Sequence, residues 1–250
     1  MKAIILAAGQ GTRFHSAHAD RPKCLIQFNR STWTILDQQI DALFTCGVKD
    51  IGIVVGYEKD QIIRHVAANY RGILSRFRFI ENPAFAETNN IYSLSLAHEW
   101  LRGDSFVCLN ADVVFDRRIL PPAVNSPAPI NMILDPAWRD ESMKVVVAGN
   151  RVTRISKQIS RSEFSGTYIG IATFAAGIQK RLFASIADLI ETGREKEPFD
   201  AAVQQLADEG VQVGFTSTLD LPWAEIDEPG DLAFARLYVF PRLDPAASAA

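Results

Sequence analysis

The first 23 residues join an apolar run, a glycine-containing loop and two basic side chains, and this segment limits the fold more than any other. Residues 3–8 are apolar and end at a turn, which is typical of a strand buried on both faces of a parallel sheet. Gly9 and Gly11 carry no Cβ, so the loop can approach a ligand closely with its N–H groups turned toward bound oxygens. Arg13 and Lys23 add a guanidinium fork and a compact ammonium near the same strand end. The segment therefore predicts a phosphate-binding loop, although two glycines alone would also suit a plain strand-to-helix turn.

Strands and helices alternate through the first half of the chain. Further apolar strands are expected at residues 50–56, 76–81, 105–112 and 130–134. Apolar residues at helical spacing predict helices over residues 35–47, 59–69 and 88–101, the first of them capped by Ser31 or Thr32. Crossovers between parallel strands are right-handed and cover one face of the sheet. We therefore expect an α/β fold, a Rossmann-like doubly wound, mostly parallel mixed sheet flanked by helices, with ligands at the carboxyl ends of the strands.

The second half predicts a small β-rich region. Residues 143–148 and 151–155 read as strands on either side of Gly149-Asn150, a two-residue signal for a tight hairpin. Residues 166–174 form a further strand, whose glycines would let another group approach closely. These pieces are expected to cover the rim of the main sheet.

Composition excludes several classes of protein. The chain has 250 residues and a formal net charge of −3, so it offers no overall basic character for binding nucleic acid. It has neither the long apolar run of a membrane span nor a signal-peptide cleavage site, so we expect no membrane contact and a cytoplasmic location. Cys24, Cys46 and Cys108 share no metal-ligand spacing, and we interpret them as packed residues.

Two aspartates stand where metal ligands would be useful. Asp112 emerges at the end of an otherwise apolar strand, directly after Asn110 and Ala111. Asp227 follows a short apolar stretch just ahead of a Pro-Gly turn. Magnesium beside substrate phosphates usually takes one or two carboxylates and waters as ligands. The pair therefore predicts a Mg²⁺ site, although a lone Asp at a strand end is often a helix cap.

A pair of amides opens the helix expected at residues 88–101. Asn is a favoured N-cap, and Thr88 could share that role with Asn89 and Asn90. An Asn side chain also offers a donor and an acceptor together, which reading a base edge or binding ribose hydroxyls requires. Because this helix begins at the rim where the glycine loop lies, we favour a binding role.

The order of these pieces resembles the phosphocholine cytidylyltransferase branch of the nucleotidyltransferase superfamily. The resemblance covers nearly the whole chain and rests on Leu6-Ala7-Ala8-Gly9-x-Gly11-x-Arg13, Pro22-Lys23, Asn89-Asn90, Asp112, Met143-Lys144-Val145, Ile155-Ser156-Lys157, Tyr168-Ile169-Gly170 and Trp223-Ala224-Glu225-Ile226-Asp227. It implies Mg²⁺-dependent transfer from a nucleoside triphosphate to a small phosphorylated acceptor, with release of pyrophosphate. Arg13, Lys23, Asp112 and Asp227 would be the catalytic residues, and the two aspartates would hold the metal.

The resemblance also implies where the nucleotide binds. The residues concerned are Leu6, Ala7, Ala8, Gly9, Gln10, Gly11, Thr12, Arg13, Lys23, Thr88, Asn89, Asn90, Asn110 and Ala111. Sugar-phosphate members of the superfamily read the base with a Gly-containing segment near this helix start. Asn89 and Asn90 in its place favour CTP and leave GTP and UTP as alternatives.

The domain organisation follows from the same resemblance. We expect one nucleotidyltransferase domain over residues 1–243, with a nucleotide-binding part at about 1–135. An acceptor-binding part at about 136–228 would be inserted into the same sheet, and residues 244–250 would form a disordered tail. A homodimer is left open.

The acceptor stays open between phosphocholine, an aminoalkyl phosphate or phosphonate, and a sugar or cyclitol phosphate. A quaternary ammonium would need ring faces and carboxylates, whereas a sugar would use polar side chains. The expected acceptor contacts are Tyr92, Asp135, Lys144, Lys157, Tyr168, Trp223 and Glu225. The rival functions are a glycosyltransferase and a non-catalytic nucleotide-binding module. The presence of both Asp112 and Asp227 favours the nucleotidyltransferase.

Overall fold

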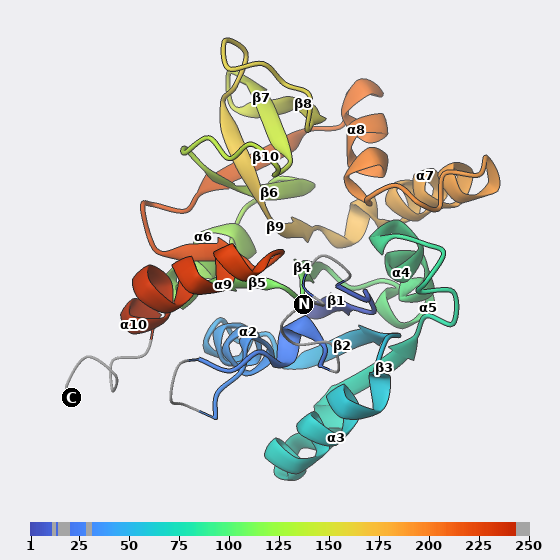
Figure 1. The fold of residues 1–250 in the computed structure, drawn as a ribbon. Coiled ribbons are helices and arrows are strands. Elements are labelled where there is room, and N and C mark those ends of the chain that lie inside the picture. Colours follow the sequence, from blue (N-terminus) through green and yellow to red (C-terminus); the bar gives the residue numbers. More distant parts are fainter. Residues whose placement is uncertain (12–13, 15–20, 29–31, 244–250) are drawn as a thin grey trace.

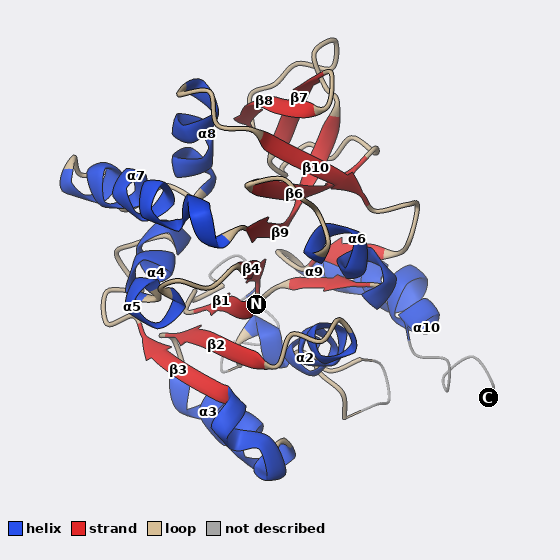
Figure 2. Ribbon diagram, turned by 180° about the vertical axis from the view of Figure 1, so that it is seen from behind, coloured by secondary structure: helices blue, strands red, loops and turns tan. Residues whose placement is uncertain are grey.

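The computed structural model describes residues 1–11, 14, 21–28 and 32–243, and one large sheet with helices on both faces dominates it (Figures 1 and 2). The strands of this sheet are β1 (Lys2–Ala7), β2 (Asp50–Val55), β3 (Phe77–Glu81), β4 (Phe106–Asn110), β6 (Ile130–Asp135), β7 (Lys144–Ala148), β8 (Arg151–Ser156), β9 (Gly166–Phe174) and β10 (Val213–Ser217). A separate two-stranded sheet joins β5 (Val113–Phe115) to β11 (Trp223–Glu225). The helices are α2 (Ile35–Thr45), α3 (Lys59–Asn69), α4 (Asn90–Leu96), α5 (His98–Leu101), α6 (Leu120–Val124), α7 (Gln179–Glu191), α8 (Asp200–Asp208), α9 (Pro229–Phe234) and α10 (Phe240–Leu243).

The strand order of the main sheet is β10-β6-β9-β4-β1-β2-β3, and β7 pairs with both β9 and β8. The pairs of β1 with β2 and β4, of β2 with β3, and of β10 with β6 are parallel. The antiparallel pairs all involve β9 or the β7–β8 hairpin. The predicted fold class, a mostly parallel mixed sheet flanked by helices, is confirmed, and the carboxyl ends of β1 and β4 lie next to each other.

The central strand β1 packs against helices on both of its faces. Ile4 and Leu6 belong to the core cluster formed with α4, α5, α7 and α8. Ala3, Ile5 and Ala7 alternate with them and belong to the cluster formed with α2, α3 and α6. Successive strand side chains point to opposite faces, so a strand covered on both sides must be apolar throughout. This explains the uninterrupted apolar run at the start of the sequence.

The first helix begins later than the sequence analysis expected. Its N-cap is Thr34 rather than Ser31 or Thr32: the Asp37 N–H donates to the Thr34 hydroxyl, and the Thr34 N–H donates to the Asp37 carboxylate at 2.9 Å. This reciprocal capping box satisfies two N–H groups that an uncapped helix would leave without partners. The helix expected at residues 88–101 is divided into α4 and α5, whereas β9 has the predicted bounds.

Strands from both halves of the chain enter the main sheet, because β9 lies between β4 and β6. The boundaries proposed at residues 135 and 243 stay a prediction, and residues 244–250 lie outside the described part of the chain. Cys24 and Cys108 are buried and Cys46 is half-buried, all as free thiols. Within residues 1–11, 14, 21–28 and 32–243, no helix combines the length and the apolar character needed to span a bilayer.

Candidate active site

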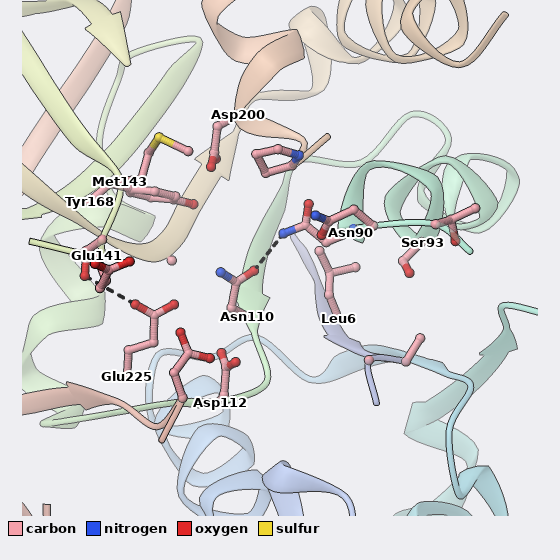
Figure 3. Close-up of a pocket in the computed structure, with 18 of the residues that line it drawn as sticks. Leu6, Asn90, Ser93, Asn110, Asp112, Glu141, Met143, Tyr168, Asp200 and Glu225 are labelled. Carbon is pink, nitrogen blue, oxygen red and sulfur yellow. Dashed lines mark hydrogen bonds between the residues drawn. The ribbon is translucent and has the colours of Figure 1, made fainter. Parts of the chain in front are cut away.

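A cavity of about 380 Å³ opens where β1 and β4 end, between α4 on one side and β9 and β11 on the other (Figure 3). A smaller pocket of about 80 Å³ adjoins it and shares Leu6, Gly9 and Asp112 with its lining. Open α/β sheets bind ligands at the carboxyl ends of their strands. The cavity therefore lies at the edge of the sheet where a ligand was expected.

We distinguish three parts of this cavity. The helix-start end consists of Asn82, Thr88, Asn89, Asn90 and Ser93, and the floor consists of Gly9, Gly11, Lys23, Asp112 and Asp227. The Asp200 end consists of Glu141, Met143, Tyr168, Asp200 and Glu225. Figure 3 shows Asn90 and Ser93 on one side and Asp200, Tyr168 and Met143 on the other, with Asn110 between them. A ligand bound over the floor can therefore extend in two directions.

The glycine loop leaves β1 at the floor. Gly11 has a φ of +62°, in the left-handed region that L side chains rarely adopt. A Cβ at Gly11 would lie 2.9 Å from Cε of Lys23, so the loop packs directly against that lysine. A Cβ at Gly9 would meet no described atom within 4 Å, and Gly9 lines both pockets. The loop thus combines a tight turn with open space beside its backbone.

Most of the loop residues expected to bind nucleotide face these two pockets. Leu6, Ala7, Ala8, Gly9 and Gly11 each line at least one of them, as does Ala111. Gln10 lines neither. Thr12 and Arg13 lie outside the described residues, so their predicted roles stay predictions.

The ammonium of Lys23 lies between the two predicted metal ligands. Its Nζ is 2.7 Å from Oδ1 of Asp227 and 3.8 Å from Oδ2 of Asp112. All three side chains are mostly buried, with exposed fractions of 14%, 23% and 26% for Lys23, Asp227 and Asp112. The structure thus brings together three residues that are far apart in sequence, and the two carboxylates converge on one cation.

Asp112 and Asp227 are neighbours because the strands next to them pair. β5 begins directly after Asp112 and pairs antiparallel with β11, which ends two residues before Asp227. The Ile226 N–H donates to the Asp112 carbonyl at 2.9 Å, and the Asp227 N–H donates to Oδ2 of Asp231 at 2.9 Å. The sequence analysis did not predict β5, because three residues are too few for a periodic signal.

Gln39 of α2 holds the turn that carries Asp112. The side chain is fully buried, and its Nε2 donates to the carbonyls of Asn110 at 2.9 Å and Val113 at 2.7 Å. These carbonyls flank the turn, so one amide fixes both of its sides. The sequence analysis missed this residue. The available signal was a polar side chain four residues after Ile35, on the apolar face of the helix.

The two amides at the start of α4 hold groups of the protein itself. Asn89 is the N-cap: its Oδ1 accepts the Asn90 N–H at 2.7 Å, and its Nδ2 donates to the Lys196 carbonyl at 3.1 Å. Asn90 accepts the Phe199 N–H at 2.8 Å and donates to Oδ1 of Asn110 at 3.4 Å. Both also line the cavity, so they join α4 to β4 and to the segment before α8 while presenting polar surface to a ligand.

Asn82 and Ser93, two further residues of the helix-start end, were not predicted as site residues. Asn82 is 1% exposed, and its Nδ2 donates to the hydroxyls of Ser93 at 3.0 Å and Thr88 at 3.2 Å. The sequence analysis ended the strand at residue 81 and assigned Asn82 no role in the site. Its side chain instead ties the loop after β3 to α4 and fixes the shape of this end.

Three of the expected acceptor contacts lie at the cavity. Tyr168 and Glu225 belong to the Asp200 end, and Lys157 also lines the cavity. Burial raises the pKa of Glu225, and the charges of Asp112 and Asp227 raise it further, whereas Lys23 and Lys157 oppose the shift. Ionisation of the carboxyl groups in this part of the cavity is therefore unfavourable without a further cation.

The other four expected acceptor contacts, Tyr92, Asp135, Lys144 and Trp223, do not line the cavity. Asp135 is buried and accepts hydrogen bonds from the Trp223 indole N–H at 2.6 Å and from the Thr218 hydroxyl at 3.0 Å. The polar groups of Asp135 and Trp223 are therefore hydrogen-bonded to each other within the protein. Tyr92 is half-buried and also lies outside the lining.

Lys144 is buried against other parts of the protein. Its residue is 1% exposed, and its Nζ donates to the carbonyls of Asp140 at 2.6 Å and Lys157 at 3.1 Å. The ammonium also lies 4.7 Å from the centre of the Trp138 ring. A buried ammonium needs such partners because desolvation is costly. Lys144 therefore braces the segment before β7 instead of facing a ligand.

Asp200 was not among the predicted site residues. It lies in the first turn of α8 with 6% of its surface exposed, and its Oδ1 has no hydrogen-bond partner. Burial raises its pKa to about 7, against the opposing charge of Lys157. A buried, unpartnered carboxylate at a cavity wall is an unusual feature that calls for a ligand.

The chain matches the model of the MobA-like NTP transferase domain over residues 3–205. It is 30% identical over 244 residues to the 2-aminoethylphosphonate cytidylyltransferase of Lancefieldella rimae, covering 95% of this chain and 93% of the relative. The matches to three other relatives, all of them cytidylyltransferases or a CMP-phosphonate synthase by name, cover between 37% and 54% of the relative's length.

Solved structures give the same result. The CTP:phosphocholine cytidylyltransferase of Streptococcus pneumoniae superposes with a TM-score of 0.78 at 26% identity, over 94% of this chain and 97% of that one. The inositol-1-phosphate CTP transferase of T. maritima has a TM-score of 0.79 at 22% identity, over 96% of both chains, and supports the fold alone. With its glycine loop, its paired aspartates and these relatives, the chain belongs to the MobA-like NTP transferase family and is a nucleotidyltransferase.

Proposed function

We propose that this protein is a Mg²⁺-dependent cytidylyltransferase. It couples CTP to the phosphate or phosphonate of a small acceptor and releases pyrophosphate. The observation that carries the proposal is the cluster of Lys23, Asp112 and Asp227 beside the glycine loop, at the floor of a cavity with two ends. One end can hold the nucleotide and the other the acceptor. The names of the relatives described above each refer to CTP or to cytidylyl transfer, which supports CTP as the nucleotide.

Asp112 and Asp227 are suited to hold magnesium. Their oxygens converge on the Lys23 ammonium, so the fold already arranges two carboxylates around a positive charge. Among the described residues no three His, Cys, Asp or Glu side chains form a metal-binding group. Two carboxylates, supplemented by substrate oxygens and waters, are the usual protein contribution to a magnesium site beside phosphates. When bound, Mg²⁺ would neutralise charge on the phosphate oxygens.

The chemistry requires positioning and charge neutralisation. An oxygen of the acceptor attacks the α-phosphorus in line, a new P–O bond forms, and the bond to the bridging oxygen breaks as pyrophosphate leaves. Both reactants are anions, and an ionised phosphate or phosphonate needs no general base. The N–H groups around Gly9 and Gly11 cradle the triphosphate, and Lys23 neutralises the charge that develops on the leaving group. The sequence predicts that Arg13 also neutralises charge on the triphosphate.

The test is pyrophosphate release with Mg²⁺, crossing CTP, GTP, UTP and ATP against aminoalkyl, choline, sugar and cyclitol phosphates and phosphonates. We expect release with CTP and one class of acceptor. Release with GTP or UTP and a sugar phosphate would replace the proposal with the sugar nucleotidyltransferase alternative. Binding of CTP without release for any pair would support the non-catalytic module.

The Asp112→Asn variant tests the metal assignment. It keeps the shape of the side chain and its backbone contacts but removes one charge, so we expect a folded protein whose kcat falls about 100- to 1000-fold. Asp188→Asn, an equal change at an exposed position of α7, is the matched control and should keep full activity. Full turnover by folded Asp112→Asn would refute the assignment.

A further inference from the structure

The Asp200 end contains two buried polar groups without partners. Oδ1 of Asp200 and the hydroxyl of Tyr168 are both shielded from solvent, and neither makes a hydrogen bond. The two residues are 6% and 3% exposed. Figure 3 shows both side chains directed toward the same part of the cavity. Leaving such a group unsatisfied is unfavourable, so a ligand that supplies a donor here gains affinity.

The charges at this end select the kind of donor. The carboxyl groups of Glu141, Asp200 and Glu225 line it, with Lys157 as the nearby ammonium. Burial makes the charged form of Asp200 unfavourable, and its pKa rises to about 7. A ligand cation with N–H groups would favour the ionised form and satisfy the free oxygen.

We propose that the Asp200 end binds a primary ammonium group, so that the acceptor of the reaction proposed above is an aminoalkyl phosphate or phosphonate. This inference rests on the proposed function. The phosphate or phosphonate lies over the floor, next to Lys23 and the two aspartates, and the ammonium donates to Asp200 and to the Tyr168 hydroxyl.

A quaternary ammonium fits this end less well. It has no N–H to give Asp200, and it is normally held by several aromatic faces. Among the described residues of the cavity lining, the aromatic side chains are Tyr168 and Phe85. Trp223 packs in the core, where its indole N–H donates to Asp135. The ring of Trp138 makes a cation–π contact with the Lys144 ammonium. One ring at the Asp200 end is too few for a cage.

A sugar or cyclitol fits less well for a different reason. Its hydroxyls could donate to Asp200, but they carry no charge to offset the buried carboxylate. Three carboxyl groups would then face a neutral ligand. The specificity should therefore depend on the positive charge of the ligand and on its N–H groups together.

The first test uses the wild-type enzyme with CTP, Mg²⁺ and four acceptors, three of which are phosphonates that differ only at the end far from phosphorus. We expect kcat/KM for 2-aminoethylphosphonate to exceed that for n-propylphosphonate, in which a methyl replaces the ammonium, by about 100-fold or more. The N,N,N-trimethyl analogue and inositol 1-phosphate should also fall far below the amine. Equal or faster turnover of any of these three would overturn the inference.

The second test is the Asp200→Asn variant, which keeps the size of the side chain, removes its charge and replaces one acceptor oxygen with a donor. We expect its kcat/KM for the amine to fall about 100-fold through acceptor KM, with KM for CTP unchanged. The preference for the amine over n-propylphosphonate should largely disappear. Asp208→Asn is the matched control, because Asp208 is an exposed carboxylate at the other end of α8. An unchanged preference in a folded Asp200→Asn variant would overturn the inference.

Direct binding separates this inference from the proposed function. If no acceptor supports pyrophosphate release, calorimetric titration of the wild-type protein with 2-aminoethylphosphonate and n-propylphosphonate still tests the Asp200 end. Selective binding of the amine would support the ammonium site although the proposed reaction had failed. Equal binding of the two, or binding of neither, would overturn it.

Discussion

The floor of the cavity contains half-buried carboxylates and the Asp200 end a buried one, and the two regions differ in the partners of these carboxylates. At the floor, Asp112 and Asp227 converge on the Lys23 ammonium. At the Asp200 end, Oδ1 of Asp200 has no partner within the protein. The floor is thus arranged around a cation that the chain itself supplies, whereas the Asp200 end depends on a group from outside.

The difference has a functional meaning. The reaction needs the same cations for every phosphorylated acceptor, so the fold can build the floor in advance with β5, β11 and Gln39. The far end decides which acceptor is used, and its unsatisfied carboxylate lowers affinity for any ligand without a donor. Changes at the floor should therefore affect turnover, and changes at the Asp200 end should affect acceptor choice.

The largest expected effect is that of Asp227→Asn. This isosteric change removes half of the carboxylate pair, and we expect kcat to fall about 1000-fold at saturating CTP and acceptor. The rate of pyrophosphate release measures this fall. The substitution leaves the hydrogen bond from the Asp227 backbone N–H to Asp231 in place, so the local backbone should be preserved. The same chemical change at Asp200 should act mainly on acceptor KM. If Asp227→Asn instead raised acceptor KM and spared kcat, the division between floor and far end would be wrong.

Gln39→Met tests whether the hydrogen bonds of Gln39 position Asp112 at the floor. Without its two donors the turn carrying Asp112 loosens, and we expect kcat to fall about 30-fold with a higher Mg²⁺ requirement. Gln38→Met is the matched control, because Gln38 is also buried in α2 but donates to the Phe115 carbonyl, away from the turn.

Both glutamine variants should lose roughly 1–3 kcal/mol of unfolding free energy, since Gln38→Met removes the donor of one carbonyl and Gln39→Met the donor of two. Thermal unfolding measures that loss. Only Gln39→Met should shift the Mg²⁺ dependence, and an equal shift in both variants would assign Gln39 a merely structural role.

The sequence predicted the floor because each of its parts has a local signal. Gly9 and Gly11 follow an apolar strand, Asp112 ends another, and Asp227 precedes a Pro-Gly turn. Parallel strands bring their carboxyl ends to one edge, so the fold class alone places Gly9 and Asp112 together. The pairing of β5 with β11, which brings Asp227 there, is a long-range contact between three-residue strands and left no periodic pattern.

Tyr168 and Glu225 of the Asp200 end were among the expected acceptor contacts, but Asp200 itself could not be predicted, because its position in the sequence resembles an ordinary helix start. An Asp in the first turn of a helix is usually a response to the helix dipole. Lys144 resembles an exposed hairpin lysine, yet tertiary packing buries it on backbone carbonyls and the Trp138 ring. Whether a charged side chain faces a ligand or the protein depends on contacts distant in sequence.

The smallest expected effect is a pH dependence of acceptor choice. Asp200 has a raised pKa of about 7, so it is mostly ionised above that pH and mostly neutral below it. Lys157 favours the ionised form of Asp200, and the buried Tyr168 and Cys108 have pKa values raised in part by the Asp200 charge. The carboxyl groups of Glu141 and Glu225 line the same part of the cavity.

An aliphatic ammonium keeps its charge throughout this range, so only the carboxylate side of the contact titrates. Lowering the pH from 7.5 to 6.5 should therefore reduce the ratio of kcat/KM for 2-aminoethylphosphonate over n-propylphosphonate about threefold, the change in the ionised fraction of a group with a pKa of about 7. Because both acceptors share the phosphonate, its own titration largely cancels in the ratio. The ratio should be flat in Asp200→Asn, and a flat wild-type profile would mean that Asp200 is not the group that faces the ammonium.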